Sequence, residues 1–198
     1  MKLVLASNNK KKLTELREIL SSAGFEVISQ AEAGCDFEAE ENGTTFAENA
    51  YIKAKAAMDA CGLPAIADDS GLCVEALGGE PGVYSARYSG SHEHTDEQRN
   101  DYLLAKLGTQ KDRRAKFVSS IACCFPDGRV IRAEGECTGT IGFEPKGENG
   151  FGYDPLFITD DYPGRTMAEL TPEEKNAVSH RGRALKLFKK EIMQNADK

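Results

Sequence analysis

Short apolar runs alternate with a helical pattern at the start of the chain. Lys2–Ala6 is apolar and β-branched at its centre, which predicts a strand. Between Leu13 and Leu20 the apolar residues recur at helical spacing, and Gly24 ends this predicted helix. Phe25–Ser29 predicts a second short strand. A strand, a helix and a strand in this order are typical of the parallel part of an α/β sheet.

Capping boxes mark helix starts further along the chain. In this motif a Ser or Thr is followed three residues later by Glu or Gln. The spacing occurs at residues 45–48, 95–98 and 171–174, and it predicts three helices, of which the first ends near Ala60 and the second at Gly108. A last amphipathic helix is predicted after Ser179.

A long hairpin is predicted in the second half of the chain. Residues 116–125 and 129–141 flank a Pro-Asp-Gly turn, which is typical of two antiparallel strands. With the parallel start, this predicts an α/β fold with a mixed central sheet and flanking helices. The 198 residues suffice for one large domain or two small lobes, and no linker, repeat or low-complexity segment divides them. We therefore expect one domain over residues 1–198.

One apolar run ends in two acids. Pro64–Ala67 predicts a buried strand, and Asp68, Asp69, Ser70 and Gly71 follow it. Ligands bind at the carboxyl ends of strands in open α/β sheets, so the acids suit a binding site. Asp, Ser and Gly are also common in turns. On its own, the stretch favours a turn, followed by a separate strand at 72–76. If one strand continues through both acids, their side chains point to opposite faces and need not share a proton.

Charge and cysteine usage narrow the class of protein. The net charge of −7 argues against a general nucleic-acid binder, which would carry a basic surface. No apolar run approaches the ~20 residues of a membrane span, so no membrane partner is expected. The six cysteines show no CxxC spacing. We therefore expect free thiols in a cytoplasmic protein, with neither a zinc site nor a redox pair.

Three polar stretches have residue types that suit a nucleotide. Residues 7–12, Ser-Asn-Asn-Lys-Lys-Lys, lie between the first strand and its helix, where helix N–H groups and the helix dipole attract an anion. The glycine-rich residues 147–155 carry Phe151, which either stacks on a base or fills the core. His180 and Arg181 place basic side chains at a helix start, against the dipole, which indicates function rather than stability.

Together these stretches resemble the inosine triphosphate pyrophosphatase family, the non-canonical purine nucleotide pyrophosphatases or XTP/dITP diphosphatases, in its bacterial branch. The resemblance covers nearly the whole chain. It rests on residues 7–12, 45–55, 64–89, 150–155 and 170–181, and its most specific part is Ser179-His180-Arg181 combined with Phe151-Gly152-Tyr153-Asp154. Asn8 departs from the family, which usually has glycine there, but asparagine tolerates a left-handed backbone.

The resemblance implies two lobes around a deep cleft, a homodimer, and Mg²⁺-dependent hydrolysis of ITP, dITP and XTP to the monophosphate and pyrophosphate. It assigns Asp69 as the catalytic proton acceptor and a metal ligand, with Glu40 as second metal ligand and Glu41 as the fallback. The implied phosphate-binding residues are Ser7, Asn8, Asn9, Lys10, Lys11, Lys12 and Lys53. The remaining substrate contacts are Ser70 and, on the base side, Phe151, Gly152, Tyr153, Asp154, Lys175, His180 and Arg181.

Hydrogen bonding explains the implied selectivity. Hypoxanthine and xanthine present a 6-oxo acceptor where adenine presents an amino donor, and Arg181 and His180 can donate to it. Two alternatives remain open at this point. One is a Maf-type nucleotide pyrophosphatase with another base preference, against which Ser179-His180-Arg181 argues. The other is a nucleotide sensor that does not hydrolyse its ligand, against which Asp69 and the acidic loop argue.

Overall fold

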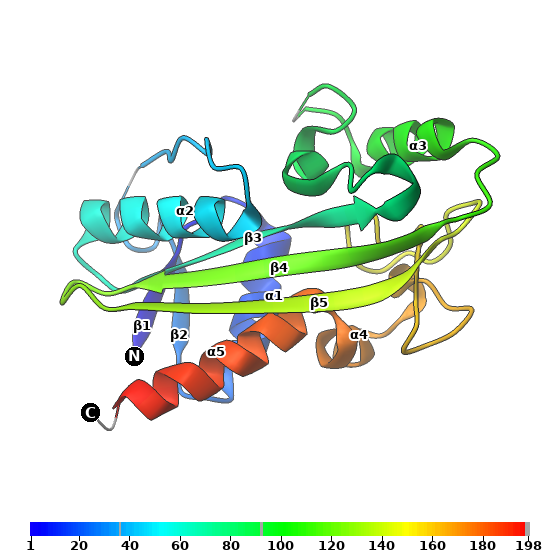
Figure 1. The fold of residues 1–198 in the computed structure, drawn as a ribbon. Helices are drawn as coiled ribbons and strands as arrows, with labels where there is room; N and C mark the ends of the chain where they lie inside the picture. The colour runs from blue at the N-terminus through cyan, green and yellow to red at the C-terminus, as the bar shows by residue number, and fades with distance from the viewer. Residues whose placement is uncertain (36, 92, 197–198) are drawn as a thin grey trace. The chain divides into compact units, whose positions relative to one another are not determined.

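The computed structural model describes residues 1–35, 37–91 and 93–196 (Figure 1). The strands of this part of the chain are β1 (Lys2–Leu5), β2 (Glu26–Ser29), β3 (Ala65–Val74), β4 (Arg114–Cys124), β5 (Val130–Ile141) and β6 (Phe157–Thr159). The α-helices are α1 (Lys10–Ser21), α2 (Phe46–Cys61), α3 (Asp96–Leu107), α4 (Pro172–Val178) and α5 (His180–Ala196). None of these described helices is both long enough and apolar enough to cross a bilayer.

The strands form one mixed sheet, which confirms the predicted α/β class. Their order is β2-β1-β3-β4-β5-β6. β1 pairs in parallel with β2 and β3, whereas β5 and β6 are antiparallel. The predicted hairpin is present as β4 and β5, and the predicted helix starts at Thr45, Thr95 and Thr171 are capping boxes in which both hydrogen bonds form.

The chain separates into two compact units, each with its own core. Unit 1 comprises residues 1–69, 119–135 and 181–198, and unit 2 comprises residues 70–118 and 136–180. Strands β3, β4 and β5 contribute residues to both units. The expectation of one two-lobed domain stays a prediction.

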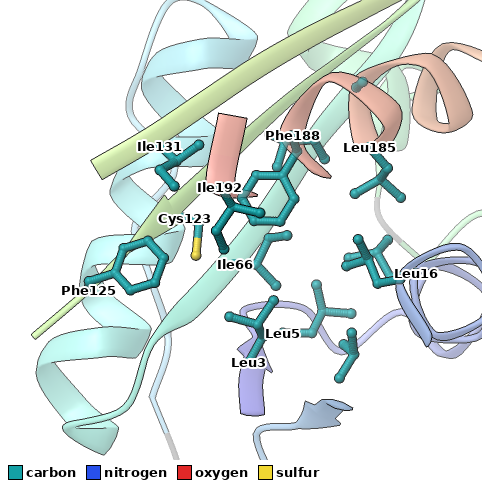
Figure 2. Packing of buried hydrophobic residues seen from close by; sticks show 14 residues of the cluster. Leu3, Leu5, Leu16, Ile66, Cys123, Phe125, Ile131, Leu185, Phe188 and Ile192 are labelled. Carbon is teal, nitrogen blue, oxygen red and sulfur yellow. The ribbon is translucent and has the colours of Figure 1, made fainter. Parts of the chain in front are cut away.

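Strand alternation organises the core of unit 1. Leu3 and Leu5 of β1 and Ile66 of β3 belong to a cluster with α1 and α5, and Figure 2 shows these residues beside Phe188 and Ile192. The intervening residues of β1 and β3 belong to a second cluster, built with the alanines of α2. Helices α1 and α5 therefore cover one face of these strands, and α2 covers the other.

Unit 2 has a more aromatic core. The ring of Phe117 lies 4.6 Å from that of Phe157 and 4.7 Å from that of His180, with which it is stacked. Leu103 and Leu107 anchor α3 in the same cluster. Helix α3 is therefore fixed on a packed surface.

Strand β3 is longer than predicted. It runs without interruption from Ala65 to Val74, through Asp68, Asp69 and Gly71. The expected turn at this stretch and the separate strand at 72–76 are therefore wrong. The chain does not turn because nearly all these residues are buried on a paired central strand, and the ladder outweighs local turn preference.

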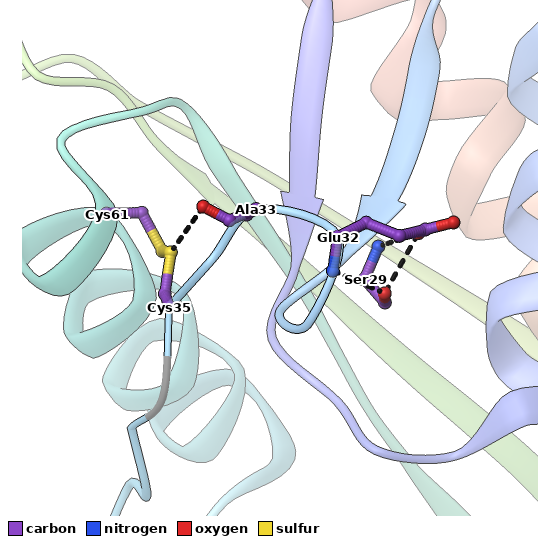
Figure 3. Close-up of a disulfide and its surroundings, with 5 residues drawn as sticks. All are labelled: Ser29, Glu32, Ala33, Cys35 and Cys61. Carbon is purple, nitrogen blue, oxygen red and sulfur yellow. Dashed lines mark hydrogen bonds between the residues drawn. A yellow bond between two sulfur atoms is a disulfide. The ribbon is translucent and has the colours of Figure 1, made fainter.

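The expectation of free thiols is also wrong for one pair. Cys35, in the loop after β2, is bonded to Cys61 at the end of α2, with their Cα atoms 5.7 Å apart (Figure 3). Separations of this size are usual for disulfides. Local spacing could not reveal the pair because the two cysteines are 26 positions apart in sequence and meet only through the fold. Cys73, Cys123, Cys124 and Cys137 are free.

Candidate active site

The two acids of β3 point to opposite faces of the strand. Asp68 shares its face with Ile66, toward α1 and α5, and Asp69 shares its face with Ala67, toward α2. Their side-chain partners differ accordingly. The register of β1 and β3, in which Leu5 pairs with Ile66, sets both acids level with the polar loop that follows β1.

Asp68 is the centre of a buried ionic network. Its carboxylate accepts hydrogen bonds from the Arg181 guanidinium, at 2.8 Å from Nη2 and 3.1 Å from Nε, and from Ser119 Oγ at 2.5 Å. Lys12 Nζ lies 2.9 Å from the same carboxylate. Arg181 also pairs with Glu15 of α1 at 2.5 Å. These contacts join α1, β3, β4 and α5.

The network keeps Asp68 ionised. Burial raises the pKa of its carboxyl, but Arg181 and Lys12 outweigh that effect and hold the pKa well below its ordinary value. A group with so low a pKa is a poor proton acceptor near neutral pH. Asp68 is therefore suited to position its neighbours, and not to exchange protons.

Asp69 lies in a different environment. Its Oδ1 is 2.6 Å from Lys53 Nζ, and the same ammonium lies 3.3 Å from Glu41. Burial raises the pKa of Asp69, and the opposing charge of Lys53 does not cancel the shift. A carboxylate whose pKa is raised accepts a proton more readily than one whose pKa is depressed, so Asp69 is the better candidate for a general base.

Two lysines converge on the backbone of β3 at Asp68, within the strand, from its two faces. Lys12 Nζ donates to the carbonyl oxygen of Asp68 at 3.2 Å, and Lys53 Nζ approaches the same oxygen at 3.4 Å. The positive charges therefore gather beside a backbone position between the two acids. A polyanion such as a triphosphate would find its counter-charges there.

The loop after β1 is partly committed to capping α1. Asn9 is the N-cap, and its side chain accepts from the amides of Lys11 and Lys12 at 3.0 and 3.1 Å. This cap starts the helix at Lys10, before the predicted start at Leu13. A phosphate bound to those amides would compete with Asn9. Ser7 Oγ accepts from the Asn9 amide at 3.1 Å, and Asn8, Lys10 and Lys11 are exposed.

Asn8 does not adopt the left-handed conformation that glycine would favour. Among the described residues, positive φ angles occur only at glycines. The loop therefore accommodates asparagine without backbone strain at this position.

A second polar cluster belongs to unit 2. Lys175 Nζ of α4 lies 2.7 Å from Asp154 Oδ2 and 4.8 Å from the centre of the Phe151 ring. The same carboxylate oxygen accepts from the Phe151 amide at 2.8 Å. Asp154 and Lys175 are both buried. An aromatic ring beside a fixed cation is a suitable platform for a flat, electron-rich heterocycle.

The other expected base-side residues have mainly structural contacts. Tyr153 is in the core, and its hydroxyl donates to the Ser85 carbonyl at 2.9 Å. The Gly152 backbone bonds to α3 through both its amide and its carbonyl. His180 is buried and stacked on Phe117. Ser70 is half-buried on β3.

Arg181 is placed differently from its expected role. We predicted that it reads the base, yet its guanidinium is only 2% exposed and is committed to Asp68 and Glu15. His180, its neighbour in sequence, packs within unit 2, whereas the contacts of Arg181 are within unit 1. The geometry therefore favours a positioning role for Arg181.

The acids near Lys53 are the candidate ligands for the expected Mg²⁺. Among the described residues, no three His, Cys, Asp or Glu side chains cluster as a metal site. Asp69 and Glu41, however, flank one ammonium group, and Mg²⁺ commonly takes one or two carboxylates plus phosphate oxygens. This donor set fits Mg²⁺ brought in with a nucleotide. Both Glu40 and Glu41 are exposed, and Glu41, not Glu40, is the one that contacts Lys53.

The chain is similar to known proteins over nearly its whole length. The model of the Ham1 family matches residues 3–191. The dITP/XTP pyrophosphatase of Haemophilus influenzae is 52% identical over 195 residues, which cover 96% of this chain and 98% of that protein. The dITP/XTP pyrophosphatase of Deinococcus deserti is 50% identical over 182 residues, covering 92% of this chain and 85% of that protein.

Solved structures agree with the sequence comparison. The Ham1 protein of Staphylococcus aureus superposes with a TM-score of 0.87 at 43% identity, covering 98% of this chain and 100% of that one. A HAM1 protein from Coxiella burnetii gives the same TM-score and identity, covering 98% of this chain and 99% of that one.

Proposed function

Because the chain belongs to the Ham1 family, we propose that it hydrolyses non-canonical purine nucleoside triphosphates, namely dITP, XTP and ITP, to the monophosphate and pyrophosphate. Relatives named dITP/XTP pyrophosphatases that are about half identical over nearly the whole chain support the reaction. The structural observation that carries it is the convergence of Lys12 and Lys53 on the Asp68 carbonyl oxygen, beside the Asp69 carboxylate.

Each side chain around Asp68 and Asp69 of β3 has a role in this proposal. Lys12 and Lys53 bind the triphosphate, together with the loop that begins at Ser7. Asp69 accepts the proton of the attacking water, because its carboxylate lies beside the lysine that would hold the phosphates. Arg181 and Asp68 act on the reaction only by holding Lys12 and this part of β3 in place.

A divalent cation is part of the proposal. Asp69 and Glu41 would hold Mg²⁺ together with phosphate oxygens, and we place Glu41 ahead of Glu40 because only Glu41 contacts Lys53. When bound, the ion would neutralise phosphate charge and polarise the phosphoryl group under attack. Lys53 would then exchange its carboxylate contacts for contacts with phosphate.

We assign the purine to the cluster of Phe151, Asp154 and Lys175. Phe151 offers a ring face for stacking, and the Lys175 ammonium, which can only donate hydrogen bonds, suits a 6-oxo acceptor better than the 6-amino group of adenine. His180 remains the second candidate donor. Arg181 contributes to the selection of the base only indirectly, because Asp68 and Glu15 engage its guanidinium.

Pyrophosphate release from dITP, XTP, ITP, dATP and dGTP tests the proposal, with and without Mg²⁺. We expect kcat/KM for dITP to exceed that for dATP by at least about 100-fold, because a site built for hydrogen bonding rejects a mismatched base strongly. EDTA should abolish turnover and Mg²⁺ should restore it. Equal rates on dITP and dATP would contradict the selectivity, and tight dITP binding without turnover would favour a sensor.

Assembly and location are extensions of the same proposal. We propose a homodimer, which the family resemblance implies, and a location in the cytoplasm. Sedimentation equilibrium at micromolar concentration measures the assembly, and a mass near 21.5 kDa, that of one chain, would refute the dimer.

A further inference from the structure

Helix α3 holds the backbone of the loop that carries Phe151. The Gly152 amide donates to Asp96 Oδ2 at 2.8 Å, and Asn100 Nδ2 donates to the Gly152 carbonyl at 3.1 Å. Asp96 and Asn100 are four residues apart on α3, so their side chains lie on one face of the helix. Both backbone hydrogen-bonding groups of Gly152, its N–H and its C=O, are therefore bound to α3.

The helix is a rigid support for these contacts. Its N-terminus is closed by the Thr95–Gln98 capping box, and Leu103 and Leu107 are fully or almost fully buried in the core of unit 2. The other carboxylate oxygen of Asp96 accepts from Arg99 Nη2 at 2.5 Å, which restricts its rotation. The contact to Gly152 therefore transmits the position of the helix to the loop.

Asn100 makes this contact at an energetic cost. It is 5% exposed, and its Oδ1 has no hydrogen-bond partner among the described residues. A buried acceptor without a partner costs about 1–3 kcal/mol. The amide orientation is fixed because the Gly152 carbonyl can only accept. An apolar residue at position 100 would avoid that cost, so the donor to Gly152 is the feature that the side chain supplies.

The held residue is the neighbour of the stacking ring. Gly152 has a φ of +65°, in the left-handed region, and it directly follows Phe151. On the other side the Phe151 amide donates to Asp154. The direction of the Phe151 ring is thus set from one side by Asp154 and from the other by α3.

We propose that Asp96 and Asn100 are positioning residues for base selection, acting through the Gly152 peptide groups to orient Phe151. This inference rests on the proposed function, in which Phe151 stacks on the purine. Neither residue touches the substrate. They restrict the loop before the nucleotide arrives, so binding does not carry the entropic cost of ordering the loop.

The test compares Asn100→Asp, Asp96→Ala and Asp96→Asn with the wild type, using dITP and dATP. Asn100→Asp keeps the shape but presents only acceptors to the Gly152 carbonyl, and Asp96→Ala removes the acceptor for the Gly152 amide. We expect each to raise KM for dITP about tenfold or more, with kcat changed less, and to reduce the preference for dITP over dATP, since a lost hydrogen bond of about 1.4 kcal/mol is a factor of ten.

Conservative replacement separates positioning from general stability. Asp96→Asn keeps an oxygen that accepts from the Gly152 amide, so it should restore dITP preference relative to Asp96→Ala even if both lower Tm. Asp101→Asn, an exposed change on the same helix, should leave the kinetics unchanged. If Asn100→Asp fails to fold, the two Asp96 variants still decide the question.

Phe151→Leu distinguishes failure of the inference from failure of the proposed function. If the wild type does not prefer dITP, the proposed function fails. If Phe151→Leu reduces the preference but Asn100→Asp and Asp96→Ala retain it, the inference is overturned and the proposed function stands. Equal loss of kcat on both nucleotides, with unchanged KM, would also overturn the inference.

Discussion

The ionic network around Asp68 can be tested by a double-mutant cycle with Asp68→Asn and Arg181→Met. Asp68 and Arg181 side chains are 0% and 2% exposed and lie 2.8 Å apart. Removing one partner of a buried pair costs about 3–5 kcal/mol, because the other charge is left in a poorly solvated place. Lys12 and Ser119 still contact Asp68 when Arg181 is lost, so we expect the lower end of this range.

The expected effect is large enough to measure. For a chain of this size, 1 kcal/mol shifts Tm by about 2–4 °C, so each single variant should lose about 6–12 °C. In the double variant, the remaining charges of Lys12 and Glu15 balance. Its loss of stability should therefore be smaller than the sum of the two single-variant losses by about 1–3 kcal/mol. Urea unfolding followed by two probes measures these free energies, provided that the transitions coincide.

The matched control is an exposed pair of the same type. Asp127 and Arg129 are 2.8 Å apart, with side chains about half exposed, and removing either should change stability by about 1 kcal/mol or less. Additivity of the Asp68 and Arg181 effects within about 0.5 kcal/mol would refute the buried pair. Selective loss of dITP turnover in Arg181→Met, without the same loss in Asp68→Asn, would restore Arg181 as a base-reading residue.

Three further changes test separate parts of the structure. Asp69→Asn should reduce dITP turnover by at least about 100-fold, and near-normal kcat would remove Asp69 from catalysis. Gly139→Ala should destabilise by about 1–3 kcal/mol in urea unfolding, because its Cβ would clash with the Ile158 carbonyl oxygen, whereas Gly142→Ala meets nothing closer than 3.4 Å and should be milder. Cys61→Ser should lower the free energy of unfolding by about 3–4 kcal/mol, as the 26-residue separation implies, and equal stability of the two proteins without reductant would show that the disulfide does not form.

The sequence predicted those elements whose signals are local. The capping boxes at Thr45, Thr95 and Thr171 and the hairpin turn at residues 126–128 each need only a few neighbouring residues, and all are present. The helix at Lys10 began earlier than predicted because its signal is the single N-cap residue Asn9, which lies within a polar run.

Other features could not be predicted because they depend on distant partners. Asp68 and Arg181 are 113 residues apart, and nothing in either local sequence indicates that they pair. Ser119 and Glu15 complete the network, but in the sequence they are an ordinary strand serine and an ordinary helix glutamate, and nothing indicates that they belong to a site. The acidic loop likewise favoured Glu40 over Glu41 as the second metal ligand, whereas the position of Lys53 favours Glu41.

The neighbouring acids of β3 show how one strand can provide opposite electrostatic environments. A single step along the strand moves a side chain from the face of α1 and α5 to the face of α2. On the first face two cations hold the pKa of Asp68 low; on the second, burial raises the pKa of Asp69 against one lysine. Because a shift in register by one residue would exchange these environments, the network at Asp68 fixes both the strand and the acid that we assign to catalysis.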